Sequence, residues 1–196
     1  VQNYEAFLIQ ENLLDTAQIE SLRAEYKAHI LAEWDLAYQA EAELGDIPSE
    51  LNDVFAPHKP QVVNPDLDTT KNIRFVDAIS DGLRLAMREH DKLVLMGQDI
   101  ADYGGVFKIT DGFVEEFGKG RVRNTPLCES AIIGAGLGLS LKGWKAMVEM
   151  QFADFVTCGF NQIVNNLAKL HYRWGQNADV VIRMPSGGGV GAGPFH

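Results

Sequence analysis

The sequence predicts an α/β fold, a mostly parallel sheet with helices on both faces, preceded by a helical arm. From residue 72 onward, short continuous apolar runs alternate with helical patterns. Such runs are typical of strands buried on both faces of a parallel sheet. Residues 1–57 show helical periodicity without strand patterns. A chain of 196 residues with 46% hydrophobic residues is long enough for one domain with a substantial core, or for one domain plus an arm.

The helical arm is predicted from a helix-capping pattern and from a row of apolar residues along one helix face. Asp15 and Gln18 have the spacing of a capping box at a helix N-terminus. Residues 47–50 (IPSE) are expected to stop or restart the helix, and dimerisation would be the default role of such an arm. Apolar side chains recur along one face of the helix at Ile19, Leu22, Tyr26, Ile30 and Trp34.

The arm and the α/β part are predicted to be joined by an extended linker. Residues 56–70 (APHKPQVVNPDLDTT) hold three prolines and no periodic pattern. We therefore expect an arm over 1–57, a linker over 58–71 and an α/β domain over 72–196.

Within the α/β domain the expected elements alternate. In parallel sheets, ligands lie at the carboxyl ends of the strands. Glu129, Gln151 and the loop from Pro185 onward each follow a predicted strand, so they can converge there. Helices are expected over 75–87, 111–117, 130–141 and 157–174, and strands over 93–96, 122–124, 145–150 and 180–184.

Charge and cysteine usage exclude several functions. A formal charge of −10 argues against nucleic acid and anionic membrane surfaces as partners. No apolar run approaches the length of a membrane span, and the N-terminus has no basic region before an apolar stretch. Cys128 and Cys158 make neither a disulfide framework nor a zinc spacing. A cytoplasmic location fits this composition best.

Glu129 is the candidate acid of the chain. It stands before a run of small and aliphatic residues, and the next charge is Lys142. A carboxylate in apolar surroundings is costly to ionise, so Glu129 is expected to hold or donate a proton near neutral pH. The ordinary alternative is a glutamate favoured by the dipole at a helix N-terminus.

Two glycine patterns invite nucleotide-binding interpretations that fail. After Gly134 and Gly136, the dinucleotide fingerprint requires a glycine where Leu139 stands. Close packing of a small-residue helix is the better interpretation. The glycine-rich residues 187–193 lack the Lys-Ser/Thr pair of a phosphate loop.

Four sequence words occur together in the α/β part: residues 124–130 (NTPLCES), 131–136 (AIIGAG), 149–155 (EMQFADF) and 183–189 (RMPSGGG). They closely resemble the beta subunit of the thiamine-diphosphate-dependent 2-oxo acid dehydrogenases, and the resemblance runs from residue 73 to the end. It implies a transketolase-like pyrimidine-binding domain that takes part in oxidative decarboxylation with acyl transfer to lipoamide. The word QFADF looks more like the branched-chain (2-oxoisovalerate) enzymes, with pyruvate or acetoin dehydrogenase as the alternative.

The resemblance implies roles for particular residues. Glu129 matches the acid that partners a ring nitrogen of the cofactor pyrimidine, and Phe155 matches the aromatic on which that ring stacks. Leu127 and Gln151 match further pocket positions. His196 matches a histidine serving proton transfer and acyl transfer. The ordinary alternatives are plain core for Phe155 and a flexible terminus for His196.

The resemblance also implies cofactors and partners. Thiamine diphosphate is expected with magnesium, whose family motif is absent here and belongs to the alpha part. Backbone carbonyls around Val180 match part of a potassium site. The expected partners are an alpha part, a second copy forming a dimer of alpha–beta units, and a lipoyl-bearing acyltransferase. Residues 1–57 more loosely resemble the C-terminal tail of an alpha subunit, which implies an alpha–beta fusion.

One departure and two rival functions accompany this interpretation. The family commonly has Gly-Glu-Asp where this chain has Gln98 between Gly97 and Asp99, so an acidic relay between active sites would lose one carboxylate. A nucleophilic hydrolase using Cys128 and His196 is one rival, because a thiol beside a helix start can be activated. A non-catalytic assembly domain is the other.

Overall fold

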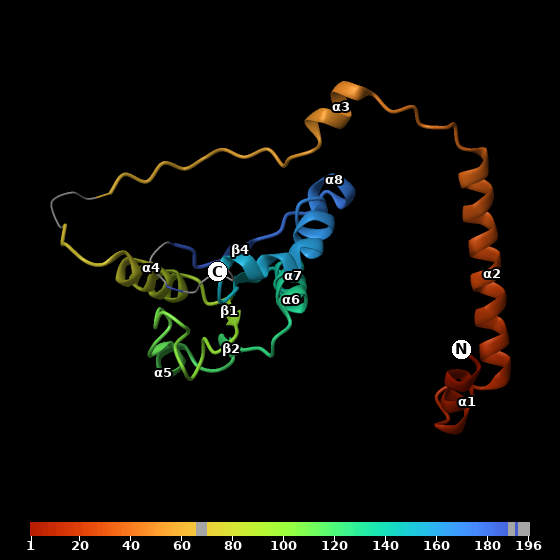
Figure 1. Ribbon diagram of the computed structural model, residues 1–196. Helices are drawn as coiled ribbons and strands as arrows, with labels where there is room; N and C mark the ends of the chain where they lie inside the picture. Colours follow the sequence, from red (N-terminus) through yellow and green to blue (C-terminus); the bar gives the residue numbers. More distant parts are fainter. Residues whose placement is uncertain (66–69, 188–190, 192–196) are drawn as a thin grey trace. The chain divides into compact units, whose positions relative to one another are not determined.

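The computed structural model describes residues 1–65, 70–187 and 191 (Figure 1). The chain divides into two compact units, Val1–Asp46 and Ile47–His196. Among the described residues, no helix is both long enough and apolar enough to cross a membrane.

The first unit is a pair of helices, α1 (Gln2–Gln10) and α2 (Thr16–Gln39). The predicted capping box at the start of α2 is confirmed. The Asp15 carboxylate accepts a hydrogen bond from the backbone N–H of Gln18 at 2.7 Å, and the Gln18 side chain accepts one from the backbone N–H of Asp15 at 2.8 Å. These bonds satisfy donors that a helix N-terminus leaves unpaired.

The predicted apolar stripe of α2 lies mostly on the surface of this unit. Ile19 is buried, whereas Tyr26, Ile30 and Trp34 are 60%, 64% and 68% exposed. The helical period was therefore predicted correctly, but within the unit the face has no core to pack against.

The second unit begins with the short helix α3 (Ile47–Asn52), where a helix restart was expected. The Tyr172 hydroxyl donates a 2.7 Å hydrogen bond to Glu50 of α3. Between α3 and the next helix, the described residues form neither helix nor strand. The predicted linker over 58–71 stays a prediction.

The second unit is built on a four-stranded parallel sheet with the strand order β2-β1-β3-β4. This confirms the predicted α/β class. β1 lies in the interior, and all five of its residues are buried. The strands are β1 (Leu93–Gly97), β2 (Val122–Asn124), β3 (Lys145–Glu149) and β4 (Val180–Arg183).

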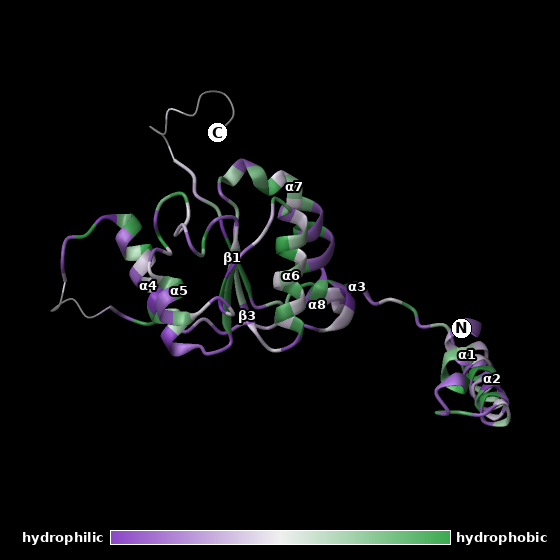
Figure 2. Cartoon of the chain, turned by 90° about the horizontal axis from the view of Figure 1, so that it is seen from below, coloured by the Kyte–Doolittle hydropathy of each residue, from purple (hydrophilic) through white to green (hydrophobic). Residues whose placement is uncertain are grey.

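Helices cover both faces of the sheet, as Figure 2 shows. On one face, α4 (Phe75–Glu89) and α5 (Phe113–Phe117) enclose a core that includes Leu95 and Met147. On the other face, α6 (Glu129–Leu141) packs against Val148. Successive side chains of one strand point to opposite faces, so β1 and β3 supply both cores.

The single helix predicted over 157–174 is wrong in detail. A 3₁₀ turn, η1 (Ala153–Phe155), leads into α7 (Val156–Asn161), then a π-helical segment η2 (Gln162–Leu167), then α8 (Leu170–Trp174). Amide side chains pair along this stretch, with Asn166 donating to Gln162. A π-helical turn holds one more residue than an α-helical turn but has the same polar and apolar composition, so the hydrophobic periodicity of the sequence did not reveal it.

The close-packing interpretation of the glycines in α6 is confirmed at Gly136. A Cβ atom there would lie 3.0 Å from Cγ1 of Val148 and 3.3 Å from Cγ1 of Val180. Gly159 of α7 is equally restricted, because its Cβ would collide with Cδ1 of Ile133 and approach the backbone of Glu129 at 3.4 Å. Helix α7 therefore crosses α6 closely, next to the first residue of α6.

Candidate functional site

The carboxyl ends of the parallel strands place the candidate residues along one edge of the sheet. Gln98 and Asp99 follow β1, Leu127 follows β2, and Gln151 follows β3. Glu129 is the first residue of α6. Loops at this edge are where parallel α/β domains bind ligands.

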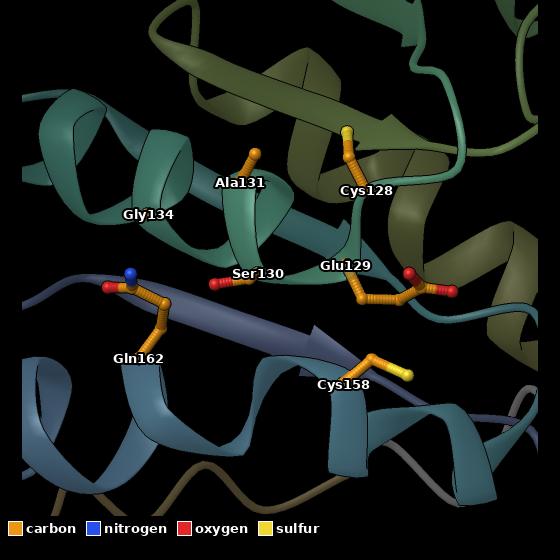
Figure 3. Close-up of a pocket in the computed structure, with 7 residues that line it drawn as sticks. All are labelled: Cys128, Glu129, Ser130, Ala131, Gly134, Cys158 and Gln162. Atoms are coloured by element: carbon orange, nitrogen blue, oxygen red, sulfur yellow. The ribbon is translucent and has the colours of Figure 1, made fainter.

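Glu129 borders an open hollow of about 630 Å³. Its side chain is half-buried and leaves the first turn of α6, and α7 faces it from the other side of the hollow (Figure 3). The remaining lining residues are small or neutral: Cys128, Ser130, Ala131, Gly134, Cys158 and Gln162. The hollow therefore combines one acid with uncharged surroundings.

Gln98 holds the carboxyl group of Glu129. Its Nε2 atom donates a hydrogen bond to Oε1 of Glu129 at 3.2 Å, and the Gln98 residue is only 4% exposed. Its own Oε1 is buried without a hydrogen-bond partner in the described part of the chain. A buried unpaired polar atom costs about 1–3 kcal/mol. The sequence marked Gln98 as a departure from the family pattern, but only the fold brings it to Glu129.

The other predicted pocket residues lie at the same edge but do not line this hollow. Leu127 is 79% exposed. Gln151 donates through Nε2 to Oδ2 of Asp99 at 3.4 Å. The ring of Phe155 meets that of Phe152 edge-on, with centroids 5.9 Å apart. The roles assigned to these residues stay predictions.

The remaining residues predicted from the resemblance lie away from this hollow or outside the described part of the chain. His196 lies outside the described residues. Val180 is the first residue of β4, so it lies at the opposite edge of the sheet from Glu129. Within residues 1–65, 70–187 and 191, no group of three His, Cys, Asp or Glu side chains could hold a metal ion. The Cys128 thiol donates to the carbonyl oxygen of Pro126 at 3.3 Å.

A buried ion pair, which the sequence did not reveal, joins the ends of β3 and β4. Glu149 is 2% exposed, and its Oε2 accepts from Nε of Arg183 at 3.0 Å. Burial raises the pKa of Glu149 above its ordinary value, and the Arg183 guanidinium opposes that rise. Arg183 also borders a second hollow of about 860 Å³. This hollow is lined mainly by apolar side chains, including Phe75, Val76, Ile79, Phe107, Ile109, Phe152, Met184 and Pro185.

A parallel α/β domain with a half-buried acid at the carboxyl edge of its sheet is typical of proteins that bind a ligand at that edge. Comparison with known proteins then gives the family. Residues 71–196 match the family described as transketolase, pyrimidine binding domain, and the chain belongs to it.

Relatives within this family share about two fifths of their residues with the chain over the matched part. The 2-oxoisovalerate dehydrogenase subunit beta of Bacillus subtilis is 41% identical over 124 residues, which are 62% of this chain and 38% of the relative. The pyruvate dehydrogenase E1 component subunit beta of Leifsonia xyli is 41% identical over 128 residues, 64% of this chain and 38% of the relative.

A mitochondrial relative of Arabidopsis thaliana, 2-oxoisovalerate dehydrogenase subunit beta 2, is 39% identical over 132 residues, 66% of this chain and 37% of the relative. The chain thus spans less than two fifths of the length of these relatives. The resemblance seen in the sequence words is confirmed for the α/β part. The alpha-subunit-like arm over 1–57 stays a prediction.

Proposed function

We propose that this chain is the pyrimidine-binding portion of a thiamine-diphosphate-dependent 2-oxo acid dehydrogenase of the branched-chain type. The observation that carries the proposal is Glu129, held by Gln98 beside an open hollow at the carboxyl edge of the sheet. Relatives named 2-oxoisovalerate dehydrogenase subunit beta support the branched-chain substrate.

The residues at this edge fit the pyrimidine end of the cofactor. When bound, thiamine diphosphate supplies a nucleophilic carbon and a sink for the electrons released on decarboxylation. Oε1 of Glu129 is engaged by Gln98, so Oε2 is the atom that would share a proton with a pyrimidine nitrogen. Phe155, which is half-buried, would present its ring to the pyrimidine.

The diphosphate and its magnesium ion require groups beyond those at this edge. A chain with a formal charge of −10 repels phosphates unless metal ligands or helix N-termini compensate. We assign these groups to an alpha part, and residues 1–57 to the tail of that part. The proposed partners are a second copy of the alpha–beta unit and a lipoyl-bearing acyltransferase. We also propose that a potassium ion binds near Val180 and that the protein is cytoplasmic.

Activity of the full-length protein tests this function. We expect lipoamide-dependent decarboxylation that requires thiamine diphosphate, with kcat/KM highest for 2-oxoisovalerate. Pyruvate is the second candidate substrate, because the Leifsonia xyli relative is named for it. Acetoin belongs in the same panel. Turnover that persists without thiamine diphosphate would contradict the proposal and return attention to a hydrolase using Cys128.

Replacement of the acid provides the residue-level test. Glu129→Gln conserves volume and removes the proton, so turnover should fall by roughly 10²–10⁴-fold while the melting temperature changes little. The measurement is kcat of the full-length variant at saturating cofactor. Wild-type turnover in this variant would exclude Glu129 from the reaction, whereas loss of both turnover and fold would call for Glu129→Asp as the second variant.

A further inference from the structure

The contact between Gln98 and Glu129 has two features that a packing role alone does not explain. Gln98, directly after the interior strand β1, is 4% exposed, and one end of its amide binds the candidate acid at 3.2 Å. The other end, Oε1, is buried without a partner among the described residues. A buried amide with one unpaired acceptor is costly, so its retention beside an acid points to a role toward that acid.

We infer that Gln98 is a positioning residue that holds the Glu129 carboxyl group in both of its protonation states. This inference rests on the proposed role of Glu129. In the orientation observed, the amide N–H donates to an ionised carboxylate. Turned by 180°, the same amide presents Oε1, which accepts a hydrogen bond from a protonated carboxyl group. One neutral side chain thus serves Glu129 before and after it gives up a proton.

A carboxylate at position 98 could not do this. Next to an ionised Glu129 it would repel, and two carboxyl groups at this distance would titrate as a coupled pair. An amide at position 98 therefore places no second acid beside Glu129.

Other titratable groups at this edge are thiols or acids that have partners of their own. The titratable side chains that border the same hollow are the thiols Cys128 and Cys158, from the α6 N-terminus and from α7. Asp99, next to Gln98 in the chain, accepts a hydrogen bond from Gln151. The buried carboxylate of Glu149 pairs with Arg183.

Two variants of the full-length protein separate the roles of the amide. Gln98→Glu introduces the second acid, and Gln98→Met keeps the length but removes both donor and acceptor. Thiamine diphosphate affinity is measured by titration calorimetry from pH 5.5 to 9. It reports on Glu129 because the proton that Glu129 shares with the pyrimidine is lost as pH rises, so the affinity should fall. The values of kcat, KM and the melting temperature are measured in the same buffers.

In Gln98→Glu, the added negative charge should make Glu129 keep its proton to higher pH. The pH at which affinity falls to half should therefore rise by about 1 unit or more. Gln98→Met should keep that midpoint but lower kcat by about 10-fold, with KM for the 2-oxo acid little changed, because a hydrogen bond to a charged group is lost. Gln162→Glu is the matched control: it adds the same charge to the same hollow from η2, and its shift should be smaller.

A merely structural Gln98 would lower the melting temperature of Gln98→Met and leave its kcat and KM unchanged. That result would overturn the inference, whether or not Gln98→Glu folds. Glu129→Gln in the same assays separates the two proposals: if it abolishes turnover while the Gln98 variants behave as wild type, the inference alone fails.

Discussion

Two glutamates at the carboxyl edge of the sheet, Glu129 at the start of α6 and Glu149 at the end of β3, have different surroundings, and this decides what each can do. Glu149 is 2% exposed and paired with a guanidinium, so its environment is closed. Glu129 is half-buried, binds a neutral amide and borders an open hollow. A group that exchanges protons with a ligand needs to be accessible to it, and Glu129 is accessible whereas Glu149 is not.

Breaking the ion pair between Glu149 and Arg183 should make the stability of the protein depend on pH. Arg183→Met leaves a buried carboxylate without its cation, which costs about 3–5 kcal/mol near neutral pH. The pKa of Glu149 is already raised by burial, and losing the opposing guanidinium should raise it further. Stability contributed by an acid with a raised pKa is lost as pH rises, so the variant should lose more melting temperature at pH 8 than at pH 5.

Glu149→Gln in the Arg183→Met background is the control for this prediction. It removes the buried charge, so the difference between the two pH values should disappear and part of the melting temperature should return. An equal loss for Arg183→Met at pH 5 and pH 8 would show that lost packing of the arginine stem, and not the unpaired carboxylate, causes the destabilisation.

Phe155 can be tested against its ordinary role as core. Its ring packs edge-on against Phe152, and such pairs contribute about 0.5–1.5 kcal/mol beyond burial. Phe155→Ala should weaken thiamine diphosphate binding in the assembled enzyme, whereas Phe155→Tyr should keep it. If Phe155→Ala lowers only the melting temperature and leaves the cofactor Kd unchanged in calorimetry, Phe155 is a core residue.

The crossing of α6 and α7 depends on Gly159, which lets one helix lie against the start of the other. This contact matters for the site because Cys158 and Gln162 line the hollow from the side opposite α6, with Gln162 across from Gly134 (Figure 3). A wider crossing would move one wall of the hollow away from the acid.

Gly159→Ala should lower the free energy of unfolding by about 1–3 kcal/mol, because the new Cβ collides with Cδ1 of fully buried Ile133. Ile133→Val removes that methyl group, so adding it to Gly159→Ala should restore part of the loss. Gly138→Ala in α6 is the matched control: no atom lies within 4 Å of its Cβ position, and the change should stabilise by about 0.5–1 kcal/mol. Denaturant unfolding measures all three variants, and equal effects of both glycine substitutions would refute the close-crossing interpretation.

The parallel orientation of the strands was predictable because apolar runs such as those of β1, β3 and β4 alternate with helical patterns. The chain between Ala153 and Trp174 was not, since 3₁₀, α and π turns share nearly the same polarity pattern. Glu129 was predictable as a lone acid before an apolar helix. Its contact with Gln98 was not, because 31 positions separate them and only the pairing of β1 with β2 brings their ends together.

For the molecule as a whole, the proposed function predicts that this chain cannot hold its cofactor alone. The described residues contain an acid and an aromatic for the pyrimidine end, but no cluster of metal ligands for a magnesium diphosphate. Titration of thiamine diphosphate and magnesium into the isolated chain of residues 1–196 should show no tight site, whereas the full-length protein should bind. Micromolar binding by the isolated chain would mean that it carries its own diphosphate site.

The strand order also has a consequence for folding during synthesis on the ribosome. β1 is made first but lies in the interior of the sheet, between β2 and β3. Its partner residues in β3 are made about 50 residues later, which is several seconds at roughly 5–20 residues per second. During those seconds the nascent segment LVLMG is an apolar strand with one side unpaired. A chaperone that shields this segment until β3 has been made should therefore raise the yield of folded protein.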